Sequence, residues 1–101
     1  MEIFHHTEQK KFYVEVEGYT AYVDYILVDG GLDIRHTVVP QEIGGRGIAG
    51  QLVKAAYDYA QLQGLRSIAT CSYAVKWLEK HPEYEGSCGS DYAGEGSCAL
   101  Y

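Results

Sequence analysis

The stretch that decides the fold is residues 36–49, which read HTVVPQEIGGRGIA. Its first residues continue an alternating strand, and Pro40 cannot donate a ladder hydrogen bond, so the strand is expected to end there. Glycines at positions 44, 45 and 47 then lead into a helix. The first N–H groups of a helix lack internal partners and carry the positive end of its dipole. The segment therefore predicts an anion site, suited to the pyrophosphate of a cofactor.

Strands are predicted on the N-terminal side of this stretch. Residues 1–10 are polar and are expected to fray or to form an edge, and residues 12–17 alternate as a half-buried strand does. Residues 19–28 are apolar on both faces, so both faces are expected to be covered. A hairpin at Asp29-Gly30-Gly31 then leads to a strand over residues 32–39. That strand is expected to place four side chains on one face: Leu32, Ile34, His36 and Val38.

The clearest helix is predicted over residues 47–63, ended by Gly64. A strand over residues 65–71 follows directly, so it is expected to lie parallel to the preceding strand after a right-handed crossover. A second helix over residues 73–80 ends at His81-Pro82. The apolar stripe of the first helix is expected to contain Ile48, Leu52, Ala55, Ala56, Tyr59 and Leu62. The predicted fold is of the α/β (α+β) class, with an antiparallel meander, a glycine-rich loop, a helix, a parallel strand and a second helix.

Composition limits the classes of protein to consider. A chain of 101 residues is expected to form one domain, 1–101, and its net charge of −6 argues against a nucleic-acid binder and suits a cationic partner. No apolar run is long enough to span a membrane, and the N-terminus lacks a signal-peptide layout, so a cytoplasmic location is expected. Free thiols are expected for the three cysteines.

The composition changes from Glu85 onward. The segment EGSC occurs at residues 85–88 and again at residues 95–98. Two copies do not make a repeat architecture, and a loose tail is expected, with a strand laid on the sheet as the alternative. The cysteine spacing does not match a zinc site, and no metal ion is expected.

The glycines alone do not select a cofactor. Residues 45–50 match the dinucleotide motif G-x-G-x-x-G, but that motif belongs after the first strand of a larger parallel sheet. Here a meander comes first, and too little chain follows for a doubly wound sheet. A Walker A loop is excluded because the chain has no Gly-Lys-Ser or Gly-Lys-Thr.

This arrangement resembles the GNAT superfamily of acetyl-CoA-dependent N-acetyltransferases, most closely its minimal one-domain subgroup. In that superfamily the pyrophosphate loop reads [Arg/Gln]-x-x-Gly-x-[Gly/Ala], and Gly47 and Ala49 fill its fourth and sixth positions. The subgroup also has a His-Thr-x-Val-Pro strand end, a cysteine at the end of the next strand and a His-Pro-Glu-Tyr segment. Residues 36–40, Cys71 and residues 81–84 match these features, so the resemblance covers about residues 11–84.

The resemblance implies how acetyl-CoA would bind. Backbone groups of Val38 and Val39 would pair with the pantetheine arm where their strand splays from strand 65–71. The acetyl thioester would lie near His36 and Cys71. The pyrophosphate would be held by backbone N–H groups of Gly44, Gly45, Arg46, Gly47, Ile48 and Ala49.

Two departures from the family pattern concern binding and chemistry. Gly44 occupies the position usually taken by Arg or Gln, so the backbone must hold more of the phosphate. Leu78 stands where many members have the tyrosine that protonates the departing thiolate. The N-terminal helices that cover the acceptor in larger members are absent, so the acceptor side is expected to be open.

Acetyl transfer to an amine requires orientation, a base and a proton for the thiolate. His36 is the candidate base. Cys71 could accept the acetyl group, protonate the thiolate or only line the pocket. Tyr73 and Tyr84 are candidate proton donors, and Arg46 could reach a phosphate.

The leading hypothesis is an N-acetyltransferase that acts on an unidentified amine. One alternative is a CoA- or acyl-CoA-binding module without catalysis, which Leu78 and Gly44 favour. The other is a small interaction protein that retains only the fold. The sequence identifies neither the acceptor nor the oligomeric state.

Overall fold

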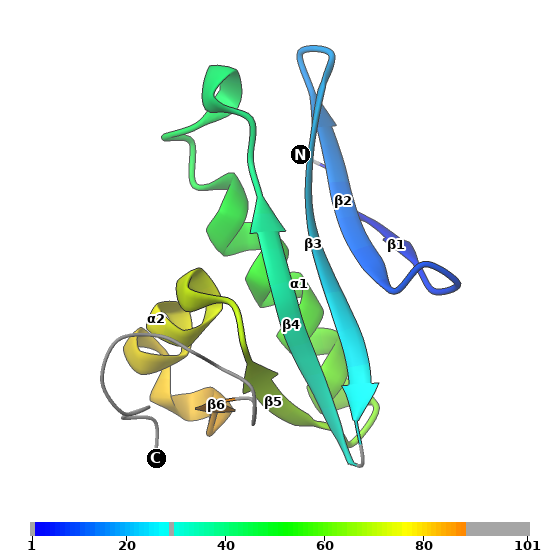
Figure 1. Cartoon of the computed structure of the whole chain (residues 1–101), viewed down its shortest axis with the longest axis vertical. Helices are drawn as coiled ribbons and strands as arrows, with labels where there is room; N and C mark the ends of the chain where they lie inside the picture. The colour runs from blue at the N-terminus through cyan, green and yellow to red at the C-terminus, as the bar shows by residue number, and fades with distance from the viewer. Residues whose placement is uncertain (1, 29, 89–101) are drawn as a thin grey trace.

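The computed structural model describes residues 2–28 and 30–88. Six strands form one sheet in the order of the chain (Figure 1). The strands are β1 (Phe4–His6), β2 (Lys11–Val16), β3 (Tyr19–Val28), β4 (Gly31–Val38), β5 (Arg66–Ala69) and β6 (Ser87–Cys88). The pairs from β1 to β4 are antiparallel, whereas β4–β5 and β5–β6 are parallel. The predicted meander followed by a parallel strand is therefore confirmed.

The two predicted helices are present. Helix α1 (Ile48–Leu62) connects β4 to β5, and α2 (Ser72–Lys80) follows β5. Short 3-10 helices lie at Gln41–Ile43, before the glycines, and at Pro82–Tyr84, after α2. Gly64 has a φ of +74°, the left-handed backbone predicted for the residue that ends α1. In Figure 1, α1 crosses behind β4, and α2 lies to the side of the sheet where β5 is.

The core lies between α1 and one face of the sheet. Six residues of α1 are buried, namely Ile48, Leu52, Val53, Ala56, Tyr57 and Ala60. The predicted stripe is correct at its N-terminal end but wrong for Leu62, which is 81% exposed. The buried stripe turns toward α2, where the rings of Tyr57 and Trp77 lie 5.8 Å apart. The Tyr57 hydroxyl also donates to the Ile68 carbonyl of β5 at 2.7 Å, which fixes the helix against the sheet.

The sheet face turned away from α1, called the open face below, is not covered along β3. Val23 and Tyr25 are buried on the α1 side, whereas Ile26 and Val28 are 40% and 37% exposed. The prediction that both faces of this strand are covered is therefore wrong for the described residues. On the same open face Lys11 extends over the ring of Tyr22, with its Nζ 4.3 Å from the ring centroid.

A β-bulge in β4 changes the face that its C-terminal half presents. Tyr25 pairs with Ile34, but Asp24 pairs with His36, so Arg35 is an extra residue on β4. Because side chains alternate along a strand, this shift turns His36 to the open face, beside Asp24. The sequence prediction is thus wrong in placing four side chains on one face: Leu32, Ile34, His36 and Val38.

Short strands form both edges of the sheet. The predicted N-terminal edge is β1, which pairs with β2. At the other edge β6 pairs with β5, so the first part of the C-terminal segment joins the sheet. Residues 89–101, which carry the rest of the tail prediction, lie outside the described residues.

Candidate functional site

The glycine-rich turn borders a hollow of about 280 Å³ at the N-terminus of α1. Gly45 and Gly47 have φ values of +77° and +75°, which glycine adopts without a Cβ clash. The first N–H group of α1 that bonds within the helix is that of Gln51, so the N–H groups before it have no intrahelical partner. Residues from the turn, α1 and α2 line the hollow: Val39, Ile43, Gly44, Gly45, Gly47, Ile48, Ala49 and Tyr73. This backbone surface is suited to an anion.

Two of the predicted cofactor-binding residues do not line this hollow. Val38 is 41% exposed and pairs with Tyr22 toward the open face. The Arg46 guanidinium forms an ion pair with Glu17, which lies in the turn between β2 and β3. The pair ties the glycine turn to that hairpin. Sequence reasoning did not find Glu17, because nothing local indicates that these two turns lie together.

Helix α2 forms the other wall of the hollow. Tyr73, in its first turn, is 42% exposed and lines the hollow as described above. Gly50, the last glycine of the G-x-G-x-x-G match, faces α2 instead. A methyl group on Gly50 would lie 3.4 Å from the Tyr73 hydroxyl and 3.8 Å from Trp77 Nε1. This glycine therefore belongs to the packing of α1 on α2.

Strands β4 and β5 diverge next to the glycine turn. Their last paired residues are Ile34 and Ala69. The Ile34 carbonyl accepts hydrogen bonds from the N–H groups of Thr70 and Cys71, at 2.9 and 3.1 Å. Beyond this point β4 continues to Val38 without a β5 partner in the described register. The edge of β4 is thus open to an extended ligand.

Cys71 lies at the start of α2, at the mouth of this gap, and is half-buried. Its thiol contacts the Thr37 hydroxyl, with Sγ 3.4 Å from Oγ1. Thr37 pairs with Val23, which is buried under α1, so this contact lies on the α1 side of β4. His36 and Cys71, the two residues expected near the acetyl thioester, therefore flank β4 from opposite faces.

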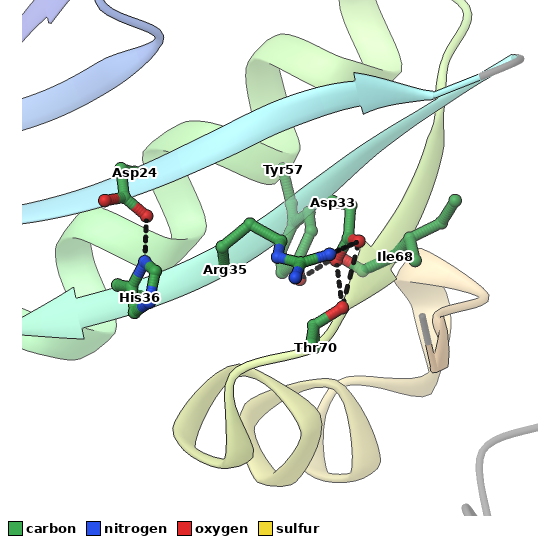
Figure 2. A network of polar contacts seen from close by, with 7 residues as sticks. All are labelled: Asp24, Asp33, Arg35, His36, Tyr57, Ile68 and Thr70. Carbon is green, nitrogen blue, oxygen red and sulfur yellow. Dashed lines mark hydrogen bonds and ion pairs between the residues drawn. The ribbon is translucent and has the colours of Figure 1, made fainter. Parts of the chain in front are cut away.

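His36 lies on the open face, with its Nδ1 2.8 Å from Asp24 Oδ1 (Figure 2). Its side chain is 69% exposed, and that of Asp24 is 31% exposed. A carboxylate that accepts from Nδ1–H leaves Nε2 as the basic nitrogen. The two residues border a second hollow, of about 420 Å³, together with Gln9, Tyr25, Ile26 and Arg35. Asp24 could not be identified from the sequence, because its pairing with His36 depends on the bulge.

The remaining tyrosine candidate is engaged elsewhere. The Tyr84 hydroxyl donates to Asp58 at 2.6 Å, and Asp58 also pairs with Lys54 at 2.8 Å. Burial, followed by the hydrogen bond to Asp58, raises the pKa of Tyr84 to about 12. Leu78, at the position of the usual family tyrosine, is fully buried. Neither position offers a proton donor to the gap between β4 and β5.

Within residues 2–28 and 30–88, no three His, Cys, Asp or Glu side chains are grouped so that they could hold a metal ion. In the same part of the chain, no helix has both the length and the apolar character needed to cross a membrane.

Comparison with known families agrees with this geometry. A family model described as GCN5-related N-acetyl-transferase matches residues 11–87. The chain belongs to this family. The match runs from the start of β2 into β6, so it includes the hollow at α1, the gap between β4 and β5, and every residue named at the second hollow except Gln9.

Relatives of this GCN5-related domain include vertebrate proteins. This chain is 43% identical to protein NATD1 of Bos taurus over 51 aligned residues, which cover 50% of this chain and 45% of the relative. It is 40% identical to protein NATD1 of Danio rerio over 55 aligned residues, which cover 52% of this chain and 50% of the relative. The chain thus spans about half the length of the curated relatives it matches.

A solved structure resembles almost the whole GCN5-related domain. It is the solution NMR structure of a GCN5-like protein from Staphylococcus aureus, with a TM-score of 0.69 and 32% sequence identity. The match covers 94% of this chain and 96% of that one. The predicted fold class and the resemblance to the GNAT superfamily are therefore confirmed.

Proposed function

We propose that this protein transfers the acetyl group of acetyl-CoA to an amine acceptor. The observation that carries the proposal is that the hollow at α1 adjoins the open edge of β4, with Val39 between them. A ligand with an anionic end and an extended, amide-containing arm suits this path. Acetyl-CoA has both parts, and membership of the GCN5-related family supports the assignment.

The donor set at the glycine turn fits a pyrophosphate. A Cβ atom on Gly45 or Gly47 would meet no atom of the described chain within 4 Å, so the backbone there is open to a ligand. Backbone N–H groups at a helix N-terminus bind phosphate without a side-chain cation. This matters because Gly44 replaces the usual Arg or Gln. The pantetheine arm would lie along Val38 and Val39.

His36 and Cys71 lie on opposite faces of β4, which suits a reaction in which the base and the proton donor act from opposite sides of the thioester. The thioester supplies an activated acetyl group. An amine that approaches from the open face would lose its proton to His36 Nε2, while Asp24 holds the ring by its Nδ1. Proton donors for the departing thiolate would stand on the other side, where the Cys71 thiol and the Tyr73 hydroxyl are the candidates. The acceptor would be an amine that is cationic in solution, in keeping with the acidic chain.

A second candidate function is a CoA- or acyl-CoA-binding module without catalysis. The buried Leu78 favours it, because the usual acid is missing and cannot be supplied from that position. Its binding site would be the same hollow, so binding alone does not separate the two functions.

A titration of the protein with acetyl-CoA, followed by amide NMR and by thiol release with a panel of amines, tests the proposal. We expect shifts at residues 38–50 and amine-dependent release that His36→Ala and Cys71→Ala reduce. Shifts without amine-dependent release would support the binding module. An absence of shifts, with no rise in melting temperature at millimolar acetyl-CoA, would support an interaction protein, because a ligand of the native state must stabilise it.

A further inference from the structure

Asp33 carries a buried carboxylate that the chemistry above does not use. The residue is 3% exposed, and a carboxylate taken out of water requires compensating partners. The Thr70 hydroxyl donates to it, with Oγ1 2.9 Å from both carboxylate oxygens. Arg35 Nη1 lies 3.5 Å from Oδ2. Figure 2 shows the three side chains converging between β4 and the end of β5.

This network lies where the pairing of β4 with β3 shifts register and where its pairing with β5 ends. Arg35 is the extra residue of the bulge against β3. Thr70 follows Ala69, the last residue of β5 that pairs with β4. The Asp33 carboxylate therefore contacts both the residue that shifts the register and the residue at which the two strands part.

The register shift decides where His36 points. In a regular ladder, Asp24 would pair with Arg35, and His36 would pair with Val23. Val23 is fully buried under α1, so the imidazole would leave the open face and lose Asp24. A bulge locally disrupts the ladder, so side-chain contacts beside it can help to fix its position along the strand.

We propose that Asp33 is a positioning residue for His36. Its carboxylate holds Arg35 and Thr70 and so keeps the bulge that places the imidazole beside Asp24. The effect on catalysis rests on the proposed acetyl transfer. The orientation of the His36 ring is independent of that proposal, and it can be measured in the protein without any substrate.

The alternative is that the network only stabilises the fold. Buried ionic networks often add little net stability. A role in stability and a role in positioning His36 can be told apart by experiment. A stabilising role would lower the melting temperature and leave the His36 ring of the folded protein unchanged. A positioning role would change the ring environment in protein that is still folded.

The test is Asp33→Asn, with Asp58→Asn as a matched control. Asp58 also accepts from a hydroxyl, that of Tyr84, and pairs with a cation, Lys54, but it lies outside the site. The ring ¹⁵N signals of His36 and the rate of acetyl transfer are measured in both variants below their melting temperatures. For Asp33→Asn we expect ring signals displaced toward those of Asp24→Asn, and a fall in kcat of about tenfold to a hundredfold, as for a misplaced catalytic group. Acetyl-CoA affinity should change far less than kcat.

Two further variants keep the proposal testable if Asp33→Asn does not fold. Thr70→Val removes only the hydroxyl and should displace the ring signals in the same direction by a smaller amount. Arg35→Gln should do likewise, and its effect should not add to that of Asp33→Asn, because both act on one bulge. Unchanged His36 signals in the folded variants would overturn the proposal. If the native protein transfers no acetyl group, the proposed function fails, but the ring signals still decide the role of Asp33.

Discussion

The two hollows of this protein are built in different ways. The hollow at α1 is lined mainly by one continuous segment, in which Gly44, Gly45 and Gly47 offer only backbone, with Val39 and Tyr73 at its sides. The hollow on the open face is lined by residues of β3, β4 and the loop before β2, among them Asp24 and His36, whose side chains the bulge places together. A binding surface made of backbone depends on local conformation, whereas one made of cross-strand side chains depends on register. Substitutions should therefore separate binding from transfer.

The largest expected effect is on the open face. His36→Ala removes the candidate base and should lower kcat by about 10²- to 10⁴-fold, the usual range for general-base catalysis. Asp24→Asn should lower it in the same direction by less, because the ring loses only its partner. Acetyl-CoA affinity, measured by calorimetric titration, should stay unchanged in both variants. His6→Ala, an exposed histidine on β1, is the control. A loss of acetyl-CoA affinity in His36→Ala would mean that the two hollows do not work separately.

The next effect is on the glycine turn. Gly47→Ala forces a left-handed backbone on a residue with a Cβ and should cost about 1–2 kcal/mol. We expect acetyl-CoA affinity to fall about tenfold, the equivalent of about 1.4 kcal/mol, as the turn relaxes. Gly50→Ala is the matched control, since it lies in α1 with only an ordinary contact to Tyr73. It should raise the melting temperature, because alanine favours the helix by about 0.8–1 kcal/mol over glycine. Equal losses of affinity in the two variants would contradict the role of the backbone at the turn.

A smaller effect concerns the ion pair between Arg46 and Glu17. Both side chains are exposed, and such pairs contribute about 0–1 kcal/mol to stability. Glu17→Gln removes a negative charge and a competitor for the guanidinium, so acetyl-CoA should bind a few-fold more tightly. Arg46→Gln should weaken binding, and added salt should reduce both effects. If both variants weaken binding alike, the ion pair orders the glycine turn, and acetyl-CoA binding at the hollow at α1 depends on these side chains as well as on the backbone.

The sequence predicts the features that depend on local conformation and misses those that depend on strand register. The strands, α1 and the glycine turn follow from periodicity, proline and glycine, all of which act locally. The predicted stripe is wrong at Leu62, the exposed last residue of α1, because the buried face runs through Val53, Tyr57 and Ala60 instead, and Tyr57 contacts Trp77 of α2. At the site, the hollow at α1 contains most of the residues predicted for the cofactor. The roles of those residues, the catalytic assignments and the cytoplasmic location stay predictions.

The residues that sequence reasoning missed act through contacts between distant segments. Asp24 meets His36 only through the bulge, Asp33 meets Thr70 through the pairing of β4 with β5, and Glu17 meets Arg46 only because two turns lie together. No spacing in the sequence reports a one-residue register shift. Since the shift inverts the face of every following side chain, one undetected residue moved His36 from the core side to the open face.

The smallest expected effect distinguishes the two tyrosines considered as proton donors. Tyr84→Phe should leave the rate of transfer unchanged, because its hydroxyl is bonded to Asp58 and does not line either hollow. Tyr73→Phe should slow transfer or weaken acetyl-CoA binding, because it removes the hydroxyl of a residue that lines the hollow at α1. The opposite result would place the proton donor on the surface beside Asp58 and detach it from the cofactor path.

The same Tyr84→Phe variant makes a prediction about pH. The pKa of Tyr84 is raised in the folded protein from 10.0 to about 12, so folding favours the protonated phenol. Its contribution to stability is therefore complete below pH 10 and is lost as the pH rises toward 12. The difference in melting temperature between the native protein and Tyr84→Phe should be constant from pH 7 to pH 9 and shrink above pH 10. Both proteins keep the ring, so a difference that persists at high pH would mean that the Tyr84 oxygen stabilises this part of the molecule without donating a proton to Asp58.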